Sequence, residues 1–287
     1  MTKVIMTVEE AYQYCQRMAK QHYENFPVAS ILLPGNIRSA VTVIYAFART
    51  ADDLADEGNS SAEQRTAALL QYEKQLSSCI NGDPMDAPVF IALQDVLQRF
   101  QLSTEPFYDL LSAFMQDVSQ IGYESFGELM DYCRRSANPV GRLLLELYGA
   151  ATPKNIAYSD GICSALQLIN FLQDIRQDYV ENKRIYIPRQ DMQKFRVTEM
   201  HIKANLSDAS VKQLLDFQIE RARKMLKAGA PLAKSLPGRL GLEMRLIIYG
   251  GTRILYRLHQ QENNLFSRPR LRLVDKAWIV WRCIFPK

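Results

Sequence analysis

The sequence predicts an all-α protein, and three observations support that fold class. Apolar residues recur at three- and four-residue spacing through most of the chain, which is the period of an amphipathic helix. Alternating apolar and polar runs, which are typical of strands, are few. Turn signals such as "EGNSS", "NGDPMDAP", "ATPKN" and "SLPG" separate the helical segments. With 287 residues, 47% of them hydrophobic, and no composition break, we expect a single domain over residues 1–287.

Helical periodicity places the elements in order along the chain. We expect helices at 8–26, 34–56, 61–80, 87–102, 104–120, 125–151, 159–181 and 208–233, with one further long helix in the last part of the chain. Pro34 stands near the start of the second helix, and Ser61 is a suitable N-cap for the third. Residues 183–192, "KRIYIPRQDM", read as a loop, and "YGGTR" at 249–253 reads as a helix break.

The chain shows no sequence signal for export or for crossing a membrane. No stretch approaches 18 uncharged apolar residues, and the N-terminal segment has no signal-peptide core, so we expect a cytoplasmic protein. The five cysteines are odd in number and lack the CxxC spacing of a zinc site. We therefore expect buried thiols and no disulfide framework.

Acidic residues are concentrated at the end of the second expected helix, in "TADDLADEG" at 50–58. Residues four apart share one helix face, so Asp52 lies beside Asp56, and Asp53 forms an adjacent pair with Glu57. A single run of this kind is often an ordinary solvated turn.

A second acidic segment, "NFLQDIRQD" at 170–178, ends another apolar helix. Asn170, Asp174 and Asp178 form one polar stripe flanked by apolar residues. Like charges at this spacing destabilise a helix, and carboxylates in an apolar setting cost more still. Oxygen-ligated Mg²⁺ holding a diphosphate would offset that cost. Two such motifs in an all-α chain predict two acidic clusters that face each other across a cavity.

The segments "YAFARTADDLADE" and "LQLINFLQDIRQDYVENKRIYIP" resemble the two aspartate-rich motifs of the squalene and phytoene synthase family. The resemblance extends over nearly the whole chain and includes "HYENFPVAS" and "CRRSANPVGRLLL". It implies the all-α isoprenoid-synthase fold with a central cavity. It also implies Mg²⁺-dependent conversion of presqualene diphosphate and water to hydroxysqualene and diphosphate, as in bacterial hopanoid biosynthesis.

The resemblance also assigns candidate site residues. The implied metal ligands are Asp52, Asp53, Asp56, Asn170, Asp174 and Asp178. The implied substrate and diphosphate contacts are His22, Asn25, Phe26, Arg49, Gln167, Arg184 and Tyr186. Tyr45 and Tyr132 match site tyrosines that offer π faces to a carbocation, whereas Asn138 and Gln173 are our candidates for holding a water molecule. Each of these residues has an ordinary alternative as core packing, a surface ion pair or a satisfied amide.

Three departures from the family pattern fall where a second diphosphate would be handled. Relatives that couple two farnesyl diphosphates usually carry Arg where this chain has Gln173. The stretch at 136–141 reads "SANPVG", and Tyr23 and Asn25 replace the usual serines near the N-terminus. These changes favour a substrate with one diphosphate. The chain shows no dinucleotide or P-loop fingerprint, so we expect no NAD(P)H.

Two other functions remain open from the sequence. One is head-to-head prenyl coupling, which gives presqualene diphosphate, dehydrosqualene or phytoene. The other is a non-catalytic binding or assembly protein of the same fold, which would not need its acidic pairs.

The C-terminal segment interleaves basic residues with Trp278 and Trp281, a composition that suits peripheral contact with an anionic membrane. The alternative is a helix packed on the body of the protein. Neither interpretation predicts a nucleic-acid partner.

Overall fold

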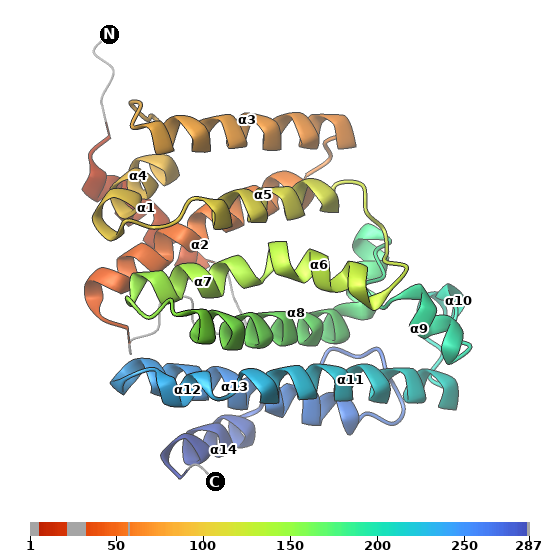
Figure 1. The fold of residues 1–287 in the computed structure, drawn as a ribbon. Coiled ribbons are helices and arrows are strands. Elements are labelled where there is room, and N and C mark those ends of the chain that lie inside the picture. The colour runs from red at the N-terminus through yellow and green to blue at the C-terminus, as the bar shows by residue number, and fades with distance from the viewer. Residues whose placement is uncertain (1–5, 22–32, 57, 286–287) are drawn as a thin grey trace. The chain divides into compact units, whose positions relative to one another are not determined.

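The computed structural model describes residues 6–21, 33–56 and 58–285 and confirms the all-α fold class. Apart from an isolated parallel bridge between Gly122 and Ile185, the described residues form helices and connections, with no strand among them. The chain divides into two compact units, residues 1–119 with 139–152 and residues 120–138 with 153–287. Figure 1 labels the helices of both.

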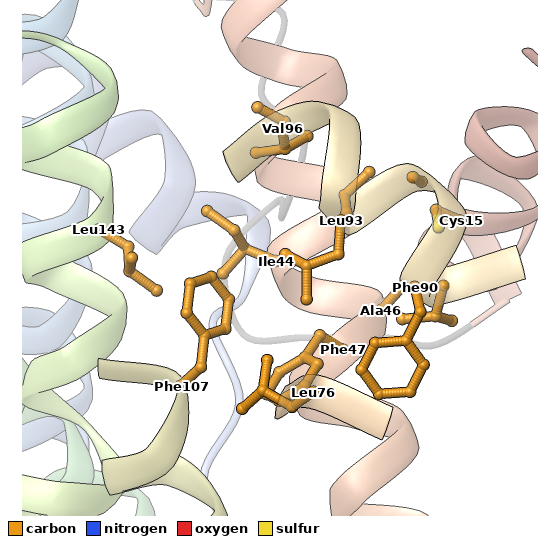
Figure 2. Packing of buried hydrophobic residues seen from close by; sticks show 14 of the residues in the cluster. Cys15, Ile44, Ala46, Phe47, Leu76, Phe90, Leu93, Val96, Phe107 and Leu143 are labelled. Carbon is orange, nitrogen blue, oxygen red and sulfur yellow. The ribbon is translucent and has the colours of Figure 1, made fainter. Parts of the chain in front are cut away.

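The first unit is built from α1 to α5 and α7. These helices are α1 (Val8–Gln21), α2 (Gly35–Asp56), α3 (Ala62–Asn81), α4 (Pro88–Phe100), α5 (Glu105–Asp117) and α7 (Asn138–Leu147). Figure 2 shows their apolar side chains meeting around Phe47, which is fully buried. The rings of Tyr72, Phe90 and Phe107 lie 5.2, 6.1 and 5.1 Å from the Phe47 ring. This core holds α2, and therefore the first acidic motif at its end, in place.

Local signals set the ends of several helices in this unit. Ser61 caps α3 as expected, because its side chain accepts from the N–H of Gln64 and the Gln64 side chain accepts from the N–H of Ser61. Gly82 ends α3 with a left-handed φ of 83°, a conformation that glycine adopts without steric cost.

The second unit contains α6 and the helices from α8 onward. These helices are α6 (Phe126–Ser136), α8 (Pro153–Asn182), α9 (Arg189–Lys194), α10 (Glu199–Lys203), α11 (Ala209–Gly229), α12 (Leu232–Ser235), α13 (Gly238–His259) and α14 (Leu273–Ile284). Helix α8 carries the second acidic motif and packs on α11, α13 and α6. Helix α8 packs closely against α11 at Gly229. A glycine is required there, since a Cβ would lie 2.5 Å from the carbonyl oxygen of Tyr158.

Several helix boundaries differ from those expected, including the start of α8, which lies at Pro153 and not at residue 159. The segment 125–151 forms two helices, because Pro139 has no N–H to donate to the carbonyl of Arg135 and so cannot continue α6. The expected loop 183–192 contains the start of α9, and α11 ends at Gly229 instead of continuing to residue 233. "YGGTR" does not break α13, because Gly251 lies inside the helix where a Cβ would come within 3.1–3.2 Å of Leu166, Ile169 and Leu226.

The cysteines agree with the expectation of unlinked thiols. All five are free, and four are buried: Cys15, Cys79, Cys133 and Cys283. Among the residues that the structure describes, no helix has the length and apolar character needed to cross a membrane.

Candidate active site

The second acidic motif lies near the C-terminal end of α8 as a continuous polar stripe. Gln167, Asn170, Asp174 and Asp178 are spaced by three or four residues and are all partly buried. Their neighbours Leu168, Ile169, Leu172 and Ile175 are buried in the core of this unit. The stripe therefore brings two carboxylates and two amides to one face at the edge of an apolar interior.

The two carboxylates of the stripe bind protons unusually tightly. Burial, followed by the charge of Asp174, raises the pKa of Asp178 to about 7, against the opposing effect of Arg184. Burial also raises the pKa of Asp174, although the charges of Arg268 and Arg270 act in the other direction. Two adjacent acids that resist ionisation form a site whose charged state requires added positive charge.

Arginines from outside α8 supply part of that charge. Arg268, in the connection between α13 and α14, forms an ion pair with Asp174: Nη2 donates to Oδ2 at 3.1 Å, and Nε lies 2.6 Å from Oδ1. Arg184 follows the end of α8, is buried, and donates its backbone N–H to the carbonyl oxygen of Asp178 at 3.2 Å. Sequence reasoning identified Arg184 but missed Arg268, because no local pattern links Arg268 to an acid 94 residues earlier in the chain.

Gln173 lies beside Asp174 on α8 and is 3% exposed. Its Nε2 donates to the carbonyl oxygen of Pro269 at 2.9 Å. Its Oε1 is buried and has no hydrogen-bond partner among the described residues. A buried acceptor in this state favours a bound donor such as water.

Four aromatic rings gather next to the stripe. Phe171 stacks on Tyr186 with ring centroids 3.8 Å apart and planes 6° from parallel. Tyr132 lies 6.2 Å from Phe171 and 6.1 Å from Tyr186, and Tyr123 lies 5.4 Å from Tyr132. The predicted residues Tyr132 and Tyr186 are thus brought together. Sequence reasoning assigned Phe171 to the core and did not identify Tyr123.

Backbone pairing holds two of these rings in place. The segment before α6 runs beside the segment after α8: the N–H of Ile185 donates to Ile121 O at 3.0 Å, and that of Arg189 to Tyr123 O at 2.9 Å. Tyr123 and Tyr186 lie within this paired stretch. Their rings are therefore fixed by loops that are 60 residues apart in sequence.

The first acidic motif, in the other unit, has a local charge arrangement. Arg49 on α2 lies 3.2 Å from Asp52 and 2.5 Å from Asp53, measured from guanidinium nitrogen to carboxylate oxygen. Asp56 is the last residue of α2 and is half-buried, and Tyr45 lies one turn before Arg49. Arg49, Asp52 and Asp53 therefore form one ion-paired group on a single helix.

The donor chemistry of both motifs fits a hard divalent cation. Carboxylate and amide oxygens dominate, and the paired acids on α8 have raised pKa values that added positive charge would relieve. In the described part of the chain, no three His, Cys, Asp or Glu side chains converge as a preformed metal cage. Mg²⁺ in proteins usually takes one or two carboxylates together with water and substrate phosphates.

The remaining predicted residues lie outside the described part of the chain or make contacts that do not point to a site. His22, Asn25 and Phe26, together with Glu57, lie outside the described residues. Asn138 is buried in the second unit, and its Oδ1 accepts from the hydroxyl of Ser164 at 2.8 Å. That bond is typical of a satisfied core amide at a helix start, the alternative considered for this residue.

Comparison with known proteins gives a consistent result. The family model described as "Squalene/phytoene synthase" matches residues 19–276. A hydroxysqualene synthase from Rhodopseudomonas palustris is 34% identical over 263 residues, covering 90% of this chain and 87% of that protein. A 15-cis-phytoene synthase from Synechocystis is 30% identical over 282 residues, or 93% and 82% of the two chains. The crystal structure of squalene synthase HpnC from Alicyclobacillus acidocaldarius is 35% identical with a TM-score of 0.82, covering 88% of this chain and 95% of that one.

Proposed function

Because the chain belongs to the squalene and phytoene synthase family, we propose that it is a hydroxysqualene synthase of hopanoid biosynthesis. In this proposal it converts presqualene diphosphate and water to hydroxysqualene and diphosphate, as a carbon–oxygen lyase, with Mg²⁺ and without NAD(P)H. The family acts on prenyl diphosphates and uses divalent metal ions. Since the family match spans both units, we also propose that they work as one domain.

The observation that carries the choice of substrate is Gln173. Relatives that couple two diphosphates usually carry Arg at this position, whereas this chain has a buried, neutral amide. One arginine fewer at the second motif, where Arg184 and Arg268 remain, fits a substrate with one diphosphate to bind. The unpartnered Oε1 of Gln173 also supplies an acceptor for the water that the reaction consumes.

The leaving group is handled by the acidic motifs and their arginines. We propose that Asn170, Asp174 and Asp178 hold Mg²⁺ on α8, and that Asp52, Asp53 and Asp56 do so on α2. Bound Mg²⁺ supplies Lewis-acid stabilisation of the departing diphosphate. Arg49 and Arg184 suit its oxygens, because guanidinium groups form bidentate hydrogen bonds with phosphate. Gln167, one turn before Asn170, contacts the same substrate in this scheme.

The hydrocarbon part of the substrate meets the aromatic cluster. Departure of the diphosphate, with both electrons of the carbon–oxygen bond, leaves a carbocation. The faces of Phe171, Tyr132 and Tyr186 stabilise such a cation through their π electrons, and Tyr45 contributes from α2. Water held by Gln173 then bonds to the cationic carbon and gives up a proton to solvent or to the released diphosphate.

Head-to-head coupling of two prenyl diphosphates is the alternative function. The phytoene synthase from Synechocystis, which matches 93% of this chain, supports it. Incubation with farnesyl diphosphate and Mg²⁺ separates the two functions, because the coupling enzyme consumes farnesyl diphosphate and the proposed enzyme does not.

The decisive experiment is product analysis by mass spectrometry. The protein is incubated with presqualene diphosphate, Mg²⁺ and ¹⁸O-labelled water, with and without NADPH. We expect hydroxysqualene that carries one ¹⁸O atom, formed equally in both reactions. Squalene as the main product, formed when NADPH is added, would contradict the proposal.

Both substrate and product of this reaction are lipids that partition into bilayers. We therefore include in the proposal a peripheral position on the cytoplasmic face of the membrane, reached through the C-terminal segment.

A further inference from the structure

The C-terminal helix α14 displays an apolar face to solvent. Its exposed large side chains are Leu273 (83% exposed), Val274 (64%), Val280 (52%), Trp281 (50%) and Ile284 (63%), followed directly by Phe285 (60%). At 100° per residue these positions, together with exposed Ala277, fall on one side of the helix, and no charged residue lies among them. An outward helix face of a water-exposed protein normally shows the opposite pattern.

The body-facing side of α14 holds the helix in this orientation. Asp275 is fully buried and accepts hydrogen bonds from Arg253 and Arg257 of α13, with Arg257 Nη2 2.8 Å from Asp275 Oδ2. One and two turns later, Ile279 and Cys283 are buried on the same side. Trp278 packs edge-on against Tyr249 of α13 at 6.0 Å. The packed-helix interpretation thus holds for Trp278, whereas Trp281 points outward.

Helix α11 of the same unit does not share this feature. The exposed positions of α11 include Gln213, Arg223, Lys224 and Lys227, which is a solvated face. Isolated exposed apolar residues are normal on any protein, but a continuous apolar helix face marks an interaction surface. Figure 1 draws α14 beside α13 at the end of the chain.

The charges around the apolar face are of one sign. Of the five basic residues in 268–285, Arg268 is paired with Asp174, which leaves Arg270, Arg272, Lys276 and Arg282 with a single acid, Asp275. Because Asp275 is buried and ion-paired, the charge that this segment presents to solvent is positive. A second copy of the chain docked face to face would bring like charges together, whereas an anionic lipid surface complements them.

We propose that the outward face of α14 inserts into the interface of an anionic bilayer. Leu273, Trp281 and Ile284 enter the boundary between headgroups and acyl chains, and the flanking Arg272 and Lys276 contact lipid phosphates. This assignment deepens the membrane position in the proposed function and rests on it for its biological purpose. The surface itself is tested without substrate, so the outcome is independent of the reaction.

The first test is co-sedimentation of the full-length protein with vesicles of phosphatidylcholine, with and without phosphatidylglycerol. We expect binding to the anionic vesicles, weakened by salt. Trp281→Glu with Ile284→Glu should lower the partition coefficient about tenfold or more, since two apolar anchors are lost. Met200→Glu on α10 is the matched control, because Met200 is also apolar and 58% exposed, and its binding should be unchanged.

Leu273→Glu is a second test variant that should leave the fold intact, because a side chain that is 83% exposed contributes little to the folded core. It should bind several-fold more weakly while keeping the wild-type circular dichroism spectrum and Tm. Replacing Arg272 and Lys276 with Gln should weaken binding to anionic vesicles, whereas replacing Lys224 and Lys227 of α11 with Gln should not.

A fluorescence measurement locates the contact. In the Trp278→Phe variant, Trp281 is the remaining tryptophan, so its emission should shift to the blue and be quenched by spin-labelled lipid when anionic vesicles are added. Failure of the wild type to bind anionic vesicles would overturn the proposal. So would a wild-type dimer in analytical ultracentrifugation that Trp281→Glu with Ile284→Glu dissociates, because the face would then belong to a second copy.

Discussion

The two acidic motifs share a spacing but differ in how their charge is compensated. On α2, Arg49 pairs with Asp52 and Asp53 from the same helix, within four residues. On α8, Asp174 pairs with Arg268, which lies 94 residues further along the chain. The α8 motif is also adjoined by a cluster of stacked aromatic rings and contains a carboxyl with a pKa of about 7.

This difference shows that one sequence pattern can produce two kinds of site. The α2 group is a local ion-pair arrangement that any isolated helix of this sequence could form. The α8 group depends on tertiary structure, because burial, Arg184 and Arg268 together set the charge of its acids. We therefore expect α2 to act mainly as a diphosphate-binding surface and α8 to be the more sensitive to its surroundings.

The largest effect is expected from removing a charge from either motif. Asp174→Asn or Asp52→Asn should lower turnover of presqualene diphosphate by about three orders of magnitude or more, since in the proposed function each removes a carboxylate from a Mg²⁺ site worth several kcal/mol in the transition state. Steady-state kinetics measures this, and circular dichroism should show an unchanged helix content. Asp131→Asn, which breaks an exposed ion pair with Arg134 and Arg135, is the control and should retain activity. Near-wild-type turnover of Asp174→Asn would remove the two-motif interpretation.

Substituting one aromatic residue in each unit tests whether its ring serves the reaction or the stability of the fold. Tyr186→Leu removes the ring stacked on Phe171, and should lower turnover about tenfold and change the product mixture, because a cation–π contact contributes about 1–2 kcal/mol. Tyr72→Leu removes a buried ring 5.2 Å from Phe47 in the other unit, and should lower stability by about 2 kcal/mol while leaving the product mixture unchanged. Mass spectrometry and thermal unfolding give the two readouts. The opposite pattern would mean that the Phe171–Tyr186 stack is structural.

The pH dependence of metal-free stability tests the buried acids of α8. In the folded protein Asp178 has a pKa of about 7, raised from 3.8 mainly by burial, so folding favours its protonated form. Its contribution to stability is therefore present below pH 4 and is lost as the pH rises through 7. Asp178→Asn cannot ionise, so it should be more stable than the wild type by about 1–2 kcal/mol near pH 8 in chelator.

That advantage should shrink as the pH falls from about 7 toward 4, because the wild-type carboxyl then regains its proton. Chemical denaturation in EDTA at several pH values gives the measurement. A constant difference across this range would show that the effect of Asp178→Asn does not come from ionisation.

The sequence predicted what depends on local periodicity and capping. Helix α3 begins after Ser61 as expected, and the Asn170–Asp174–Asp178 stripe forms because side chains four apart share a helix face. Pro139 is a signal for the break between α6 and α7. The sequence predicted one helix because the helical apolar pattern continues on both sides of it.

Other features depend on contacts between distant segments, which a single sequence does not encode in a recognisable pattern. Gly251 stays helical in α13 because Leu166 and Leu226 pack against its bare backbone, although glycine pairs usually signal a break. Arg268 reaches Asp174, and Tyr123 reaches Tyr186, through connections whose course is set by tertiary structure. Periodicity therefore predicted the acidic stripe on α8 but not Arg268, which pairs with it, or Tyr123, which packs on Tyr186.

The smallest expected effect compares the arginines of the two motifs in the metal-free protein. Arg268→Gln removes a two-point contact with an acid whose other surroundings raise its pKa, and should cost about 1 kcal/mol near pH 7 because Asp174 must then lose its charge or its pairing. Arg49→Gln breaks contacts within one helix between partly exposed groups, and should cost about 0.5 kcal/mol or less. Urea unfolding in chelator resolves this difference if both variants keep the wild-type m-value. Mg²⁺ and inorganic diphosphate should then stabilise Arg268→Gln at least as much as the wild type, since no guanidinium competes for Asp174. A larger loss from Arg49→Gln would place the more strongly coupled charges on α2 and reverse the comparison.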